Sequence, residues 1–590
     1  MKNKKRMASL LLAGCMAFSA VPVAFAADAE QATVVSDEEQ RPTSGTCGEH
    51  LTWSLSEDGT LTISGTGEME DYSDDNESPW KSFSRQIKKV VIEQGVTSIG
   101  SCAFQSSRVL STVEIPASVT KIASDALNDC WDLNTITVDA ENEKYVSEDN
   151  VLFNKDKTTL VFYATGKKDS SYIIPSSVSR IGKNAFAYTQ KLLEITIPET
   201  VKTIEDDAFF SCDNLETVTI SNGVEEIGSA AFFGCSMLQS IEIPQSVTQI
   251  GAEAFGQCGH LKRAILPEGI TAIKEAMFSN CGCLEEVYIP KSVQTIEDYG
   301  FYGCVALTKF ELPMGLKTIG KEAFSSCGSI NNVDIPATVT EIGADAFFYC
   351  ADLKKLTFRG NEPQIGEECF GFYPVTIYYP AHNTTWKEAM KKDYDGKVTW
   401  KPWSASDVFT DVKDNDWFVS YVEYTYAHRM MNGMSSNTFA PYTTLSRAMV
   451  AQILYAQAGS PSVSGESVFS DVQPGAWYYN AVQWASQKDI VHGVGNGKFA
   501  PNNDVTREQM AVMLHAAQGK PSTYSSDLNA YADANQVSGW AKDAMLWCVN
   551  KSIIGGSKSG GKTYLKPQGK ATRAEAATML TKYDQNCRVY

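Results

Sequence analysis

A repeat of 23 residues constrains the fold of this chain more than any other feature. Cysteines recur at this interval from Cys212 to Cys350, and phenylalanines recur at it from Phe186 to Phe370. A unit of this length cannot bury its own apolar face, whereas stacked units can, so strict self-similarity at such a period predicts a solenoid. We therefore expect a β-rich solenoid over residues 90–370.

Each unit is expected to contribute short strands. In Leu215–Ile220, Val218 and Ile220 alternate with polar residues, as in a half-buried strand. Many units then carry a proline, such as Pro244, which ends the strand. The period predicts about eleven rungs that would extend over roughly 50 Å at ~4.8 Å per strand.

The period is interrupted once and needs closure at both ends. An insertion lies at about 139–171, and insertions in solenoids commonly loop out and bind partners. Terminal rungs must be capped. We expect a β cap at 45–89 and a C-terminal cap and linker at 371–402, which includes Trp386.

The unit itself resembles a known repeat. The pattern I-P-x-S-V-x-x-I-G-x-x-A-F-x-x-C-x-x-L stands almost complete from Ile243 to Leu261. It is similar to the BspA-like leucine-rich repeats, which occur in surface proteins, several implicated in adhesion. The resemblance implies a binding scaffold rather than a reaction.

Three copies of a longer repeat follow, at 405–460, 465–521 and 526–586. Each copy contains an Asp, a Trp, a Gly 16 residues after that Trp, and an Arg preceded by Ser or Thr. These residues are Asp411, Trp417, Gly433 and Arg447; Asp471, Trp477, Gly493 and Arg507; and Asp533, Trp540, Gly556 and Arg573.

These motifs resemble S-layer homology (SLH) modules. The resemblance implies an α-helical three-module pseudo-trimer whose grooves bind the pyruvylated secondary cell-wall polymer of Gram-positive bacteria. The predicted fold class is therefore mixed: a leucine-rich-repeat solenoid followed by this α-helical assembly. The twelve residues named above are the predicted polysaccharide-binding residues.

The chemistry of such a site can be built from the residue types. Ser446, Thr506 and Thr572 are predicted N-caps, and Thr572 with Glu575 forms a capping box. The Arg after each cap falls where free N–H groups favour an anion, and its planar fork matches a carboxylate. The tryptophans could contact a sugar ring and the aspartates its hydroxyls.

A structural role remains the alternative for these residues, because a Trp in a small bundle is more often core. Module 1 departs from the family pattern, with Ser446 in place of Thr and Met449 in place of Glu. Its groove is the one we least expect to bind.

The N-terminus predicts export. Basic residues at positions 2–6 precede an apolar run and Ala24-Phe25-Ala26, which indicates a signal peptide over 1–26, followed by a flexible linker at 27–44. The stretch ending at Cys15 also resembles a lipobox, so lipidation of Cys15 stays open. No transmembrane segment is expected after cleavage. A net charge of -19 argues against nucleic-acid binding.

Some signals suggest chemistry that their context does not support. Residues 556–563 match the phosphate-loop pattern, but they follow a predicted helix and lead to a proline instead of opening a helix. The cysteine column is better explained as buried small residues than as disulfides or a metal site. We expect no catalytic residues, no metal and no cofactor.

Three functions can be weighed. The leading hypothesis is a cell-surface binding or adhesion protein anchored non-covalently to the wall of a Gram-positive-type bacterium. A structural S-layer-associated protein with the solenoid as spacer is the alternative, and a wall enzyme is third. The solenoid's protein or glycan ligand is unknown.

Overall fold

A computed structural model describes residues 42–392, 396–522 and 527–587. Of these, residues 44–392, 396–522 and 527–587 belong to one compact unit that begins at Ser44. The predicted signal peptide, the Cys15 lipobox and nearly all of the predicted linker lie outside the described residues.

The chain first forms a six-stranded sheet, in the order β1-β2-β3-β4-β6-β8. The strands β1, β2 and β3 pair antiparallel, and β3 then pairs parallel with β4, so this hairpin region covers the first rung. The strands are β1 (Ser44–Gly48), β2 (Leu51–Leu55), β3 (Thr60–Gly65), β4 (Lys89–Ile92), β6 (Thr112–Ile115) and β8 (Thr135–Val138), with the 3-10 turn η1 (Lys81–Phe83) and the short pair β5 (Ser98–Ile99) and β7 (Lys121–Ile122).

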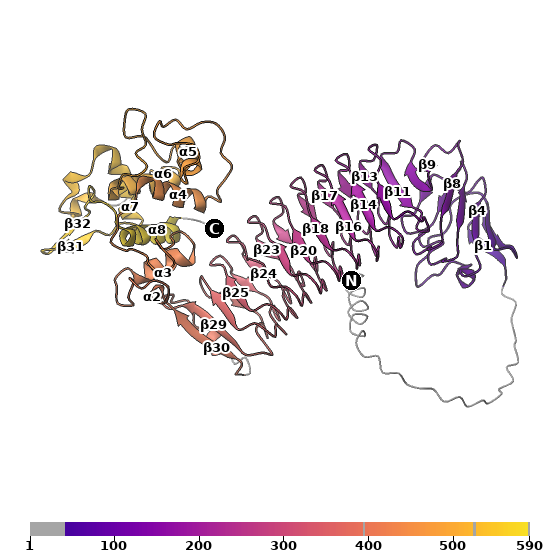
Figure 1. Ribbon diagram of the computed structural model, residues 1–590, viewed down its shortest axis with the longest axis horizontal. Coiled ribbons are helices and arrows are strands. Elements are labelled where there is room, and N and C mark those ends of the chain that lie inside the picture. The colour runs from indigo at the N-terminus through magenta and orange to yellow at the C-terminus, as the bar shows by residue number, and fades with distance from the viewer. Residues whose placement is uncertain (1–41, 393–395, 523–526, 588–590) are drawn as a thin grey trace. The chain divides into compact units, whose positions relative to one another are not determined.

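Parallel strands of successive rungs then stack side by side over most of the solenoid (Figure 1). In most of these pairs the paired residues are 23 apart, as in Ile204 with Ile227, so the sequence period is also the pairing register. The longer strands are β12 (Ser171–Ile173), β14 (Glu194–Ile197), β16 (Thr217–Ile220), β18 (Ser240–Glu242), β20 (Arg263–Ile265), β22 (Glu286–Tyr288), β25 (Asn332–Ile335), β27 (Lys355–Phe358), β29 (Val375–Pro380) and β30 (Val398–Trp403).

A second set of two-residue strands forms the other wall of the rungs. It consists of β13 (Arg180–Ile181), β15 (Thr203–Ile204), β17 (Glu226–Ile227), β19 (Gln249–Ile250), β21 (Ala272–Ile273), β23 (Thr295–Ile296), β24 (Thr318–Ile319), β26 (Glu341–Ile342) and β28 (Gln364–Ile365). The solenoid has about 14 turns. The expected eleven is too few, because strands near both ends pair in the same stack without carrying the 23-residue signature.

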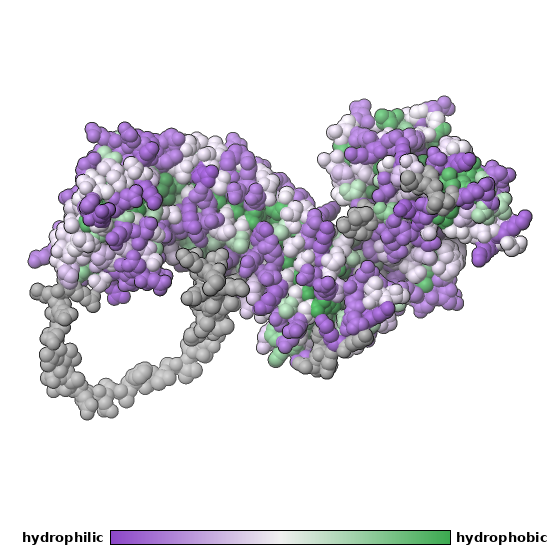
Figure 2. Space-filling view, turned by 180° about the vertical axis from the view of Figure 1, so that it is seen from behind, coloured by the Kyte–Doolittle hydropathy of each residue, from purple (hydrophilic) through white to green (hydrophobic). Residues whose placement is uncertain are grey.

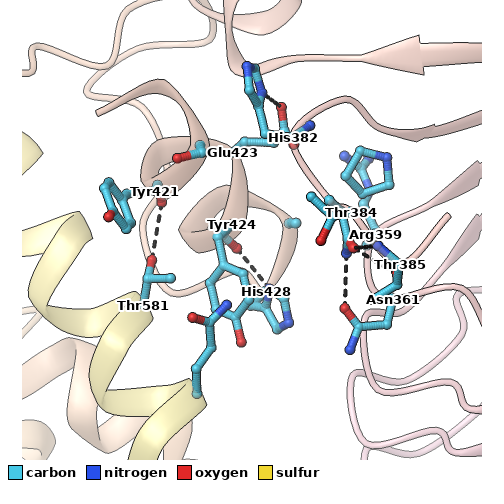
Figure 3. Close-up of a pocket in the computed structure, with 15 residues that line it drawn as sticks. Arg359, Asn361, His382, Thr384, Thr385, Tyr421, Glu423, Tyr424, His428 and Thr581 are labelled. Carbon is cyan, nitrogen blue, oxygen red and sulfur yellow. Dashed lines mark hydrogen bonds and ion pairs between the residues drawn. The ribbon is translucent and has the colours of Figure 1, made fainter. Parts of the chain in front are cut away.

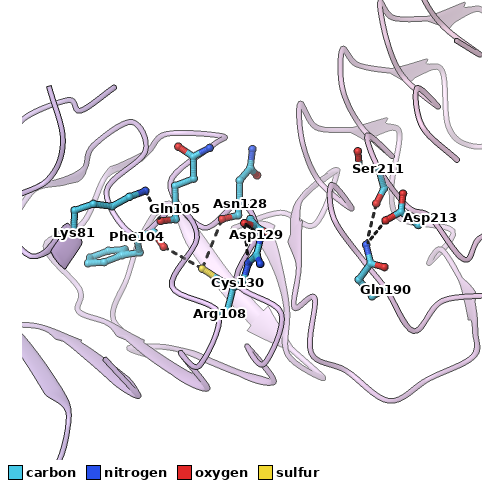
Figure 4. A network of polar contacts seen from close by, with 10 residues as sticks. All are labelled: Lys81, Phe104, Gln105, Arg108, Asn128, Asp129, Cys130, Gln190, Ser211 and Asp213. Carbon is cyan, nitrogen blue, oxygen red and sulfur yellow. Dashed lines mark hydrogen bonds and ion pairs between the residues drawn. The ribbon is translucent and has the colours of Figure 1, made fainter. Parts of the chain in front are cut away.

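Two buried columns run through the rungs. The phenylalanine rings stack at centroid distances of 4.8 to 6.4 Å from Phe186 to Phe370. Beside them, each cysteine thiol donates to the carbonyl of the Phe 26 residues earlier, as Cys258 does to Phe232 at 3.3 Å. Cys130 makes the same bond to Phe104 (Figure 4). All described cysteines are free, so this column consists of buried thiols that also bond the next rung.

The insertion differs from the expectation that it would loop out. It forms an antiparallel meander of β9 (Tyr145–Glu148), β10 (Val151–Asn154) and β11 (Thr159–Tyr163), whose last strand pairs parallel with β13. Leu152 belongs to the N-terminal core, whereas Val151 and Phe153 belong to the main core. The meander has apolar residues on both faces, so it is buried between two cores instead of being extruded.

The end of the solenoid continues directly into helices. Strand β30 pairs with β29 as far as Trp403, and Ser404 is the N-cap of α2 (Ala405–Val408). Residues 396–402, predicted as cap and linker, therefore lie in or next to a strand, because they complete the hydrogen bonding of the last rung. Trp386 is buried and donates to the carbonyl of Gly360.

The C-terminal part is helical. Its helices are α2, α3 (Val419–Ala427), α4 (Arg447–Gln457), α5 (Tyr479–Gln487), α6 (Arg507–Ala517), α7 (Lys542–Asn550) and α8 (Arg573–Cys587). It also contains the hairpin of β31 (Ser557–Ser559) and β32 (Lys562–Tyr564) and the 3-10 turns η3 (Leu528–Ala530), η4 (Ala534–Gln536) and η5 (Gly539–Ala541). Another 3-10 turn, η2 (Ala389–Lys391), precedes the helical part. No helix among the described residues is long and apolar enough to cross a membrane. The face in Figure 2 is mostly hydrophilic, with scattered apolar patches.

Candidate functional site

Three backbone hydrogen bonds close the modules into a ring. The N–H of Leu445 donates to Ala571 (3.1 Å), that of Ala571 to Val505 (2.9 Å) and that of Val505 to Leu445 (2.9 Å). Each of these residues stands two positions before the first residue of a long helix. The three helix starts therefore meet around one point in a pseudo-threefold arrangement.

Each module also packs on the next. The long helix α4 contacts α5, α6 contacts α7, and α8 contacts α3 of the first module. This cycle creates three equivalent inter-module sites. We call them site 1–2, site 2–3 and site 3–1, by the module that supplies the Arg and the module that faces it.

The three arginines lie at these sites and clamp the facing module. Arg447 Nε donates to Phe499 (2.9 Å), Arg507 Nε to Leu565 (2.9 Å) and Arg573 Nε to Phe439 (2.7 Å), each to the backbone carbonyl. Nη2 of Arg447 also donates to His492 (2.7 Å) and Nη2 of Arg573 to Asn432 (2.5 Å).

Arg447 and Arg573 are largely buried over aromatic rings. Their guanidinium carbons stand 4.6 Å from the ring centroids of Phe499 and Phe439. Burial lowers the pKa of both arginines, while Asp471 and Asp411 respectively act in the opposite direction. In each, the Nε–Nη2 edge is occupied by carbonyls.

The other edge of these two guanidinium groups is not used. Nη1 of Arg447 and of Arg573 has no hydrogen-bond partner in the described part of the chain, and neither atom is a buried unsatisfied donor. A guanidinium has five N–H donors in a planar fork. The Nη1–Nη2 edge can therefore still bind a carboxylate with two parallel hydrogen bonds.

The helix N-termini are less available than expected. The N–H of Arg447 donates to Asn503 and that of Ala448 to Pro501, both in the facing module. The next N–H, of Met449, donates to the hydroxyl of the N-cap Ser446. The expectation that free N–H groups await an anion at this helix start is therefore wrong, because the facing module occupies them.

The other two helices begin in the same way. Thr506 and Gln509 form a reciprocal capping box. Thr572 accepts from the N–H of Glu575, whose carboxylate accepts from the N–H of Thr572. At the N1 and N2 positions, Arg507 and Glu508 donate to Gly569 and Pro567, and Arg573 and Ala574 donate to Thr443 and Pro441.

The three aspartates hold turns within their own modules. Asp471 accepts the N–H groups of Phe499 and Ala500, both at 2.8 Å, and these bonds lower its pKa although desolvation acts the other way. Asp411 and Asp533 make the same paired contacts. Ala500 has φ 55°, a left-handed conformation that is strained for alanine. Both carboxylate oxygens thus stabilise that turn. The sequence alone predicted instead that they accept hydrogen bonds from sugar hydroxyls.

The three glycines allow close packing beneath these turns. A Cβ on Gly433 would stand 2.3 Å from the carbonyl oxygen of Ser435 and 2.7 Å from the Phe409 ring. Gly493 and Gly556 approach Phe469 and Tyr531 in the same way, and Gly556 has φ +76°. Their observed role is to bring the backbone against an aromatic ring.

The three tryptophans are exposed, which removes the alternative that they are core residues. Trp417, Trp477 and Trp540 are 59%, 59% and 61% exposed. Trp417 packs edge-on against Phe418, whose ring contacts Tyr442. The carbonyls of Pro441 and Thr443, on either side of Tyr442, accept the first N–H groups of α8 at site 3–1. Trp417 reaches Tyr442 through Phe418, so it lies at the rim of this site.

A separate pocket of about 290 Å³ adjoins α3 and is lined by polar residues (Figure 3). Glu423 is buried there and accepts both Nδ1 (2.8 Å) and the backbone N–H (3.0 Å) of His382. Burial raises the pKa of Glu423, and the bonds from His382 oppose that shift. This pair joins the segment after β29 to the first module.

The phosphate-loop pattern at 556–563 forms the hairpin β31–β32, in which Lys558 pairs with Thr563. It does not open a helix, so its context is unsuited to phosphate binding, as expected. Within the described residues, no group of three or more His, Cys, Asp or Glu side chains could hold a metal ion.

Comparison with known families identifies both halves. The BspA type leucine rich repeat region matches residues 81–161, 159–284 and 271–389, which together exceed half of the chain. The chain belongs to the BspA-type leucine-rich-repeat family. The S-layer homology domain matches residues 408–448, 468–511 and 530–577. Neither family is catalytic.

Relatives agree with a surface location. The chain is 34% identical over 160 residues to the surface-layer 125 kDa protein of Lysinibacillus sphaericus, which covers 27% of this chain and 13% of that one. It is 30% identical over 176 residues to an endoglucanase of Bacillus sp. (strain KSM-635), and this match covers 29% of this chain and 18% of the endoglucanase. The chain thus spans less than a fifth of either relative, and the enzyme matches through its SLH region alone.

Among solved structures, a leucine-rich repeat protein of Eubacterium ventriosum is 26% identical, with 52% of this chain and 95% of that chain covered and a TM-score of 0.35. Together, the repeats, the modules and the relatives identify a cell-surface protein associated with the cell wall.

Sequence reasoning missed two features of the sites. It did not anticipate that each Arg clamps backbone carbonyls of the next module, since nothing in a linear motif reports the partner. It also passed over Glu508, which stands where the other modules have Ala448 and Ala574. An alignment of the three motifs within this chain would have exposed that difference.

Proposed function

We propose that the three modules anchor this protein non-covalently to an acidic, pyruvylated polysaccharide of the cell wall. The observation that carries the proposal is the unused Nη1–Nη2 edge of Arg447 and Arg573, in an assembly whose three modules each present an exposed Trp. A pyruvyl ketal offers a carboxylate to the guanidinium and a sugar face to the indole.

The solenoid is then the displayed part. Its longer strands present alternate side chains to solvent, as in Thr217–Ile220, while the other side chains fill the core. A rigid extended face of this kind suits binding of a protein or glycan on another surface. We propose adhesion or ligand binding, and no catalytic activity, as the role of the solenoid. The insertion is less suited to binding a partner than the sequence suggested, because it is buried between two cores.

The alternative is a structural S-layer-associated protein in which the solenoid is a spacer. The similarity to a surface-layer protein favours it. Self-assembly of the purified chain into sheets would support this alternative, whereas a chain that stays monomeric at high concentration would favour display of a binding face.

Export by the predicted signal peptide is part of the proposal. The mature chain should begin after Ala26 if the signal is cleaved there, and at a lipidated Cys15 if the lipobox is used instead. N-terminal sequencing and intact mass of the secreted protein distinguish these outcomes.

The anchoring test is a co-sedimentation assay with the full chain. We expect the protein to pellet with intact Gram-positive sacculi and to stay in solution with sacculi stripped of secondary polymer. The Arg447→Ala/Arg573→Ala variant should lose pelleting with intact sacculi. Pelleting that is equal with intact and stripped sacculi would contradict the proposal and point to lipid anchoring or to peptidoglycan itself.

A further inference from the structure

The stack of long strands in the solenoid is interrupted between β22 and β25. The rung between them, residues 307–312, is joined to β22 by a single bridge and forms no strand pair with β25. On one side of this gap, the N–H of Thr308 donates to the carbonyl of Glu285 at 3.1 Å. On the other side, the N–H of Lys354 donates to the carbonyl of Asn331 at 3.0 Å. The equivalent bond across the gap, from the N–H of Asn331 to the carbonyl of Thr308, is absent from the described structure.

The gap leaves several backbone groups open. The N–H groups of Asn331 and Asn332 and the carbonyl of Thr308 have no hydrogen-bond partner within the part of the chain that the structure describes. All three residues are exposed. Backbone groups in a sheet are normally paired with the next strand, so groups that are unpaired and exposed can bond a ligand instead.

The residue type at one inward-facing position accounts for the gap. Phe310 stands where the rungs on either side have Val287 and Val333, each 3% exposed. Phe310 is only partly buried, and its ring stacks on Phe324 with the centroids 5.3 Å apart. A phenyl ring needs more room than a valine side chain, and strands ~4.8 Å apart do not supply it. The larger side chain therefore holds this rung away from the next one.

A pocket of about 270 Å³ lies at this gap. It is lined by one aromatic ring, one aliphatic side chain, two hydroxyls and two amides, which belong to Phe310, Ile330, Thr308, Ser329, Asn331 and Asn332. None of these six side chains is charged. Each amide offers two donors and an acceptor, and each hydroxyl can both donate and accept. The pocket thus combines an apolar ring with closely spaced donors and acceptors.

This combination suits a neutral sugar. Each hydroxyl of a sugar donates and accepts, as the amides and open backbone groups of the pocket require. The C–H face of a sugar ring can lie against the electron-rich face of a phenyl ring. An ionic ligand would lose its hydration here without meeting an opposite charge in the lining. The volume is at the small end for ligand sites, which favours a single sugar residue.

Resting on the proposed role of the solenoid as the displayed binding face, we propose that this pocket binds one neutral sugar residue, free or at the end of a glycan. The ring of Phe310 supports one face of the sugar. The amides of Asn331 and Asn332 and the open backbone groups bond its hydroxyls. The pocket is formed by the solenoid alone, so it acts separately from the three inter-module sites and takes a ligand of different charge.

The first test is saturation-transfer NMR of the full chain with neutral hexoses and N-acetylhexosamines. Each is supplied as the free sugar and as its methyl glycoside, which represents the end of a glycan. At least one should bind with a dissociation constant of about 1–10 mM, as expected for so small a ligand. No binding at concentrations about tenfold higher would overturn the proposal. That outcome would leave wall anchoring, measured by sedimentation, and adhesion to a protein untouched.

The second test restores the usual residue of the repeat. Phe310→Val should weaken sugar binding at least about tenfold, because the ring is lost and the gap can close. The melting temperature should stay the same or rise, since Val287 and Val333 stand at the equivalent positions. The matched control is Tyr288→Ala, which removes an exposed aromatic ring on β22 outside the pocket and should leave binding within about twofold. Unchanged binding in Phe310→Val, or equal loss in the control, would overturn the assignment.

Hydrogen exchange gives a readout that does not depend on binding strength. The N–H of Asn331 should exchange rapidly in the unsubstituted chain and slowly in Phe310→Val, because the bond to Thr308 can then form. Protection of this N–H in the unsubstituted chain without sugar would contradict the open gap. If Phe310→Val does not fold, the exposed pair Asn331→Ala/Asn332→Ala decides, since it should weaken binding about tenfold while the rungs stay intact. Unchanged binding in that variant would refute the site.

Discussion

The thiol of Cys281 should be almost inert toward alkylation, in contrast to that of Cys283 two residues later. Cys281 is completely buried in the cysteine column, and its Sγ donates to the carbonyl of Phe255 at 3.1 Å. Burial raises the pKa of Cys281 from 9.0 to about 12. Cys283 is partly exposed.

The magnitude follows from the thiolate population, because the thiolate is the nucleophile. At pH values well below 9, an increase of about three pKa units lowers the thiolate fraction about 1000-fold. Exclusion of the reagent from the core adds to this factor. The labelling rate of Cys281 should therefore be at least about 1000-fold below that of an unburied thiol, and far below that of the partly exposed Cys283.

The assay is pulsed alkylation with iodoacetamide at pH 7.5, followed by tandem mass spectrometry that separates the two sites within one peptide. In urea, where the column is unfolded, the two rates should become similar. A rate for Cys281 within about tenfold of that for Cys283 in the native chain would refute the reasoning, since neither burial nor a raised pKa would then protect the thiol.

Three further predictions concern stability. Phe255→Ala removes a ring that stacks 5.6 Å from those of Phe232 and Phe278, and should lower the opening free energy of the adjoining rungs, measured by hydrogen exchange, by about 3–5 kcal/mol. The exposed Tyr288→Ala control should cost less than about 1 kcal/mol, and equal costs would contradict stacking as the cause. Thr506→Ala should cost about 1 kcal/mol in thermal unfolding, because it removes the acceptor that caps α6, and no loss would show that the facing module alone caps this helix. Burial raises the pKa of Glu423 above 4.5, so the folded chain holds a proton that the unfolded chain has released, and stability should fall as pH rises from 4.5 through the folded pKa. In Glu423→Gln this fall should be absent from a series of unfolding midpoints, and an unchanged pH profile would exclude Glu423 as its source.

Much of this architecture could be predicted from spacing alone. The 23-residue interval fixed the rungs and their register, because a residue that recurs once per turn must stack on its own copies, as Ile204 does on Ile227. The positions of the Ser and Thr caps were equally local, since a cap and the N–H that it accepts are three residues apart, as in Thr506 and Gln509.

What depends on distant partners required the tertiary structure. No local pattern reveals that the three arginines donate to carbonyls of the next module, or that Arg507 also pairs with Glu575, 68 residues away in the sequence. The burial of the insertion between two cores is also a tertiary result. Its consecutive apolar residues point alternately to opposite faces, and each face finds a core to pack against only when the rungs on both sides have formed. The sequence thus determined which elements form and which residues face inward. The tertiary structure decided which charges meet, since electrostatic pairing depends on distance in space rather than on separation along the chain.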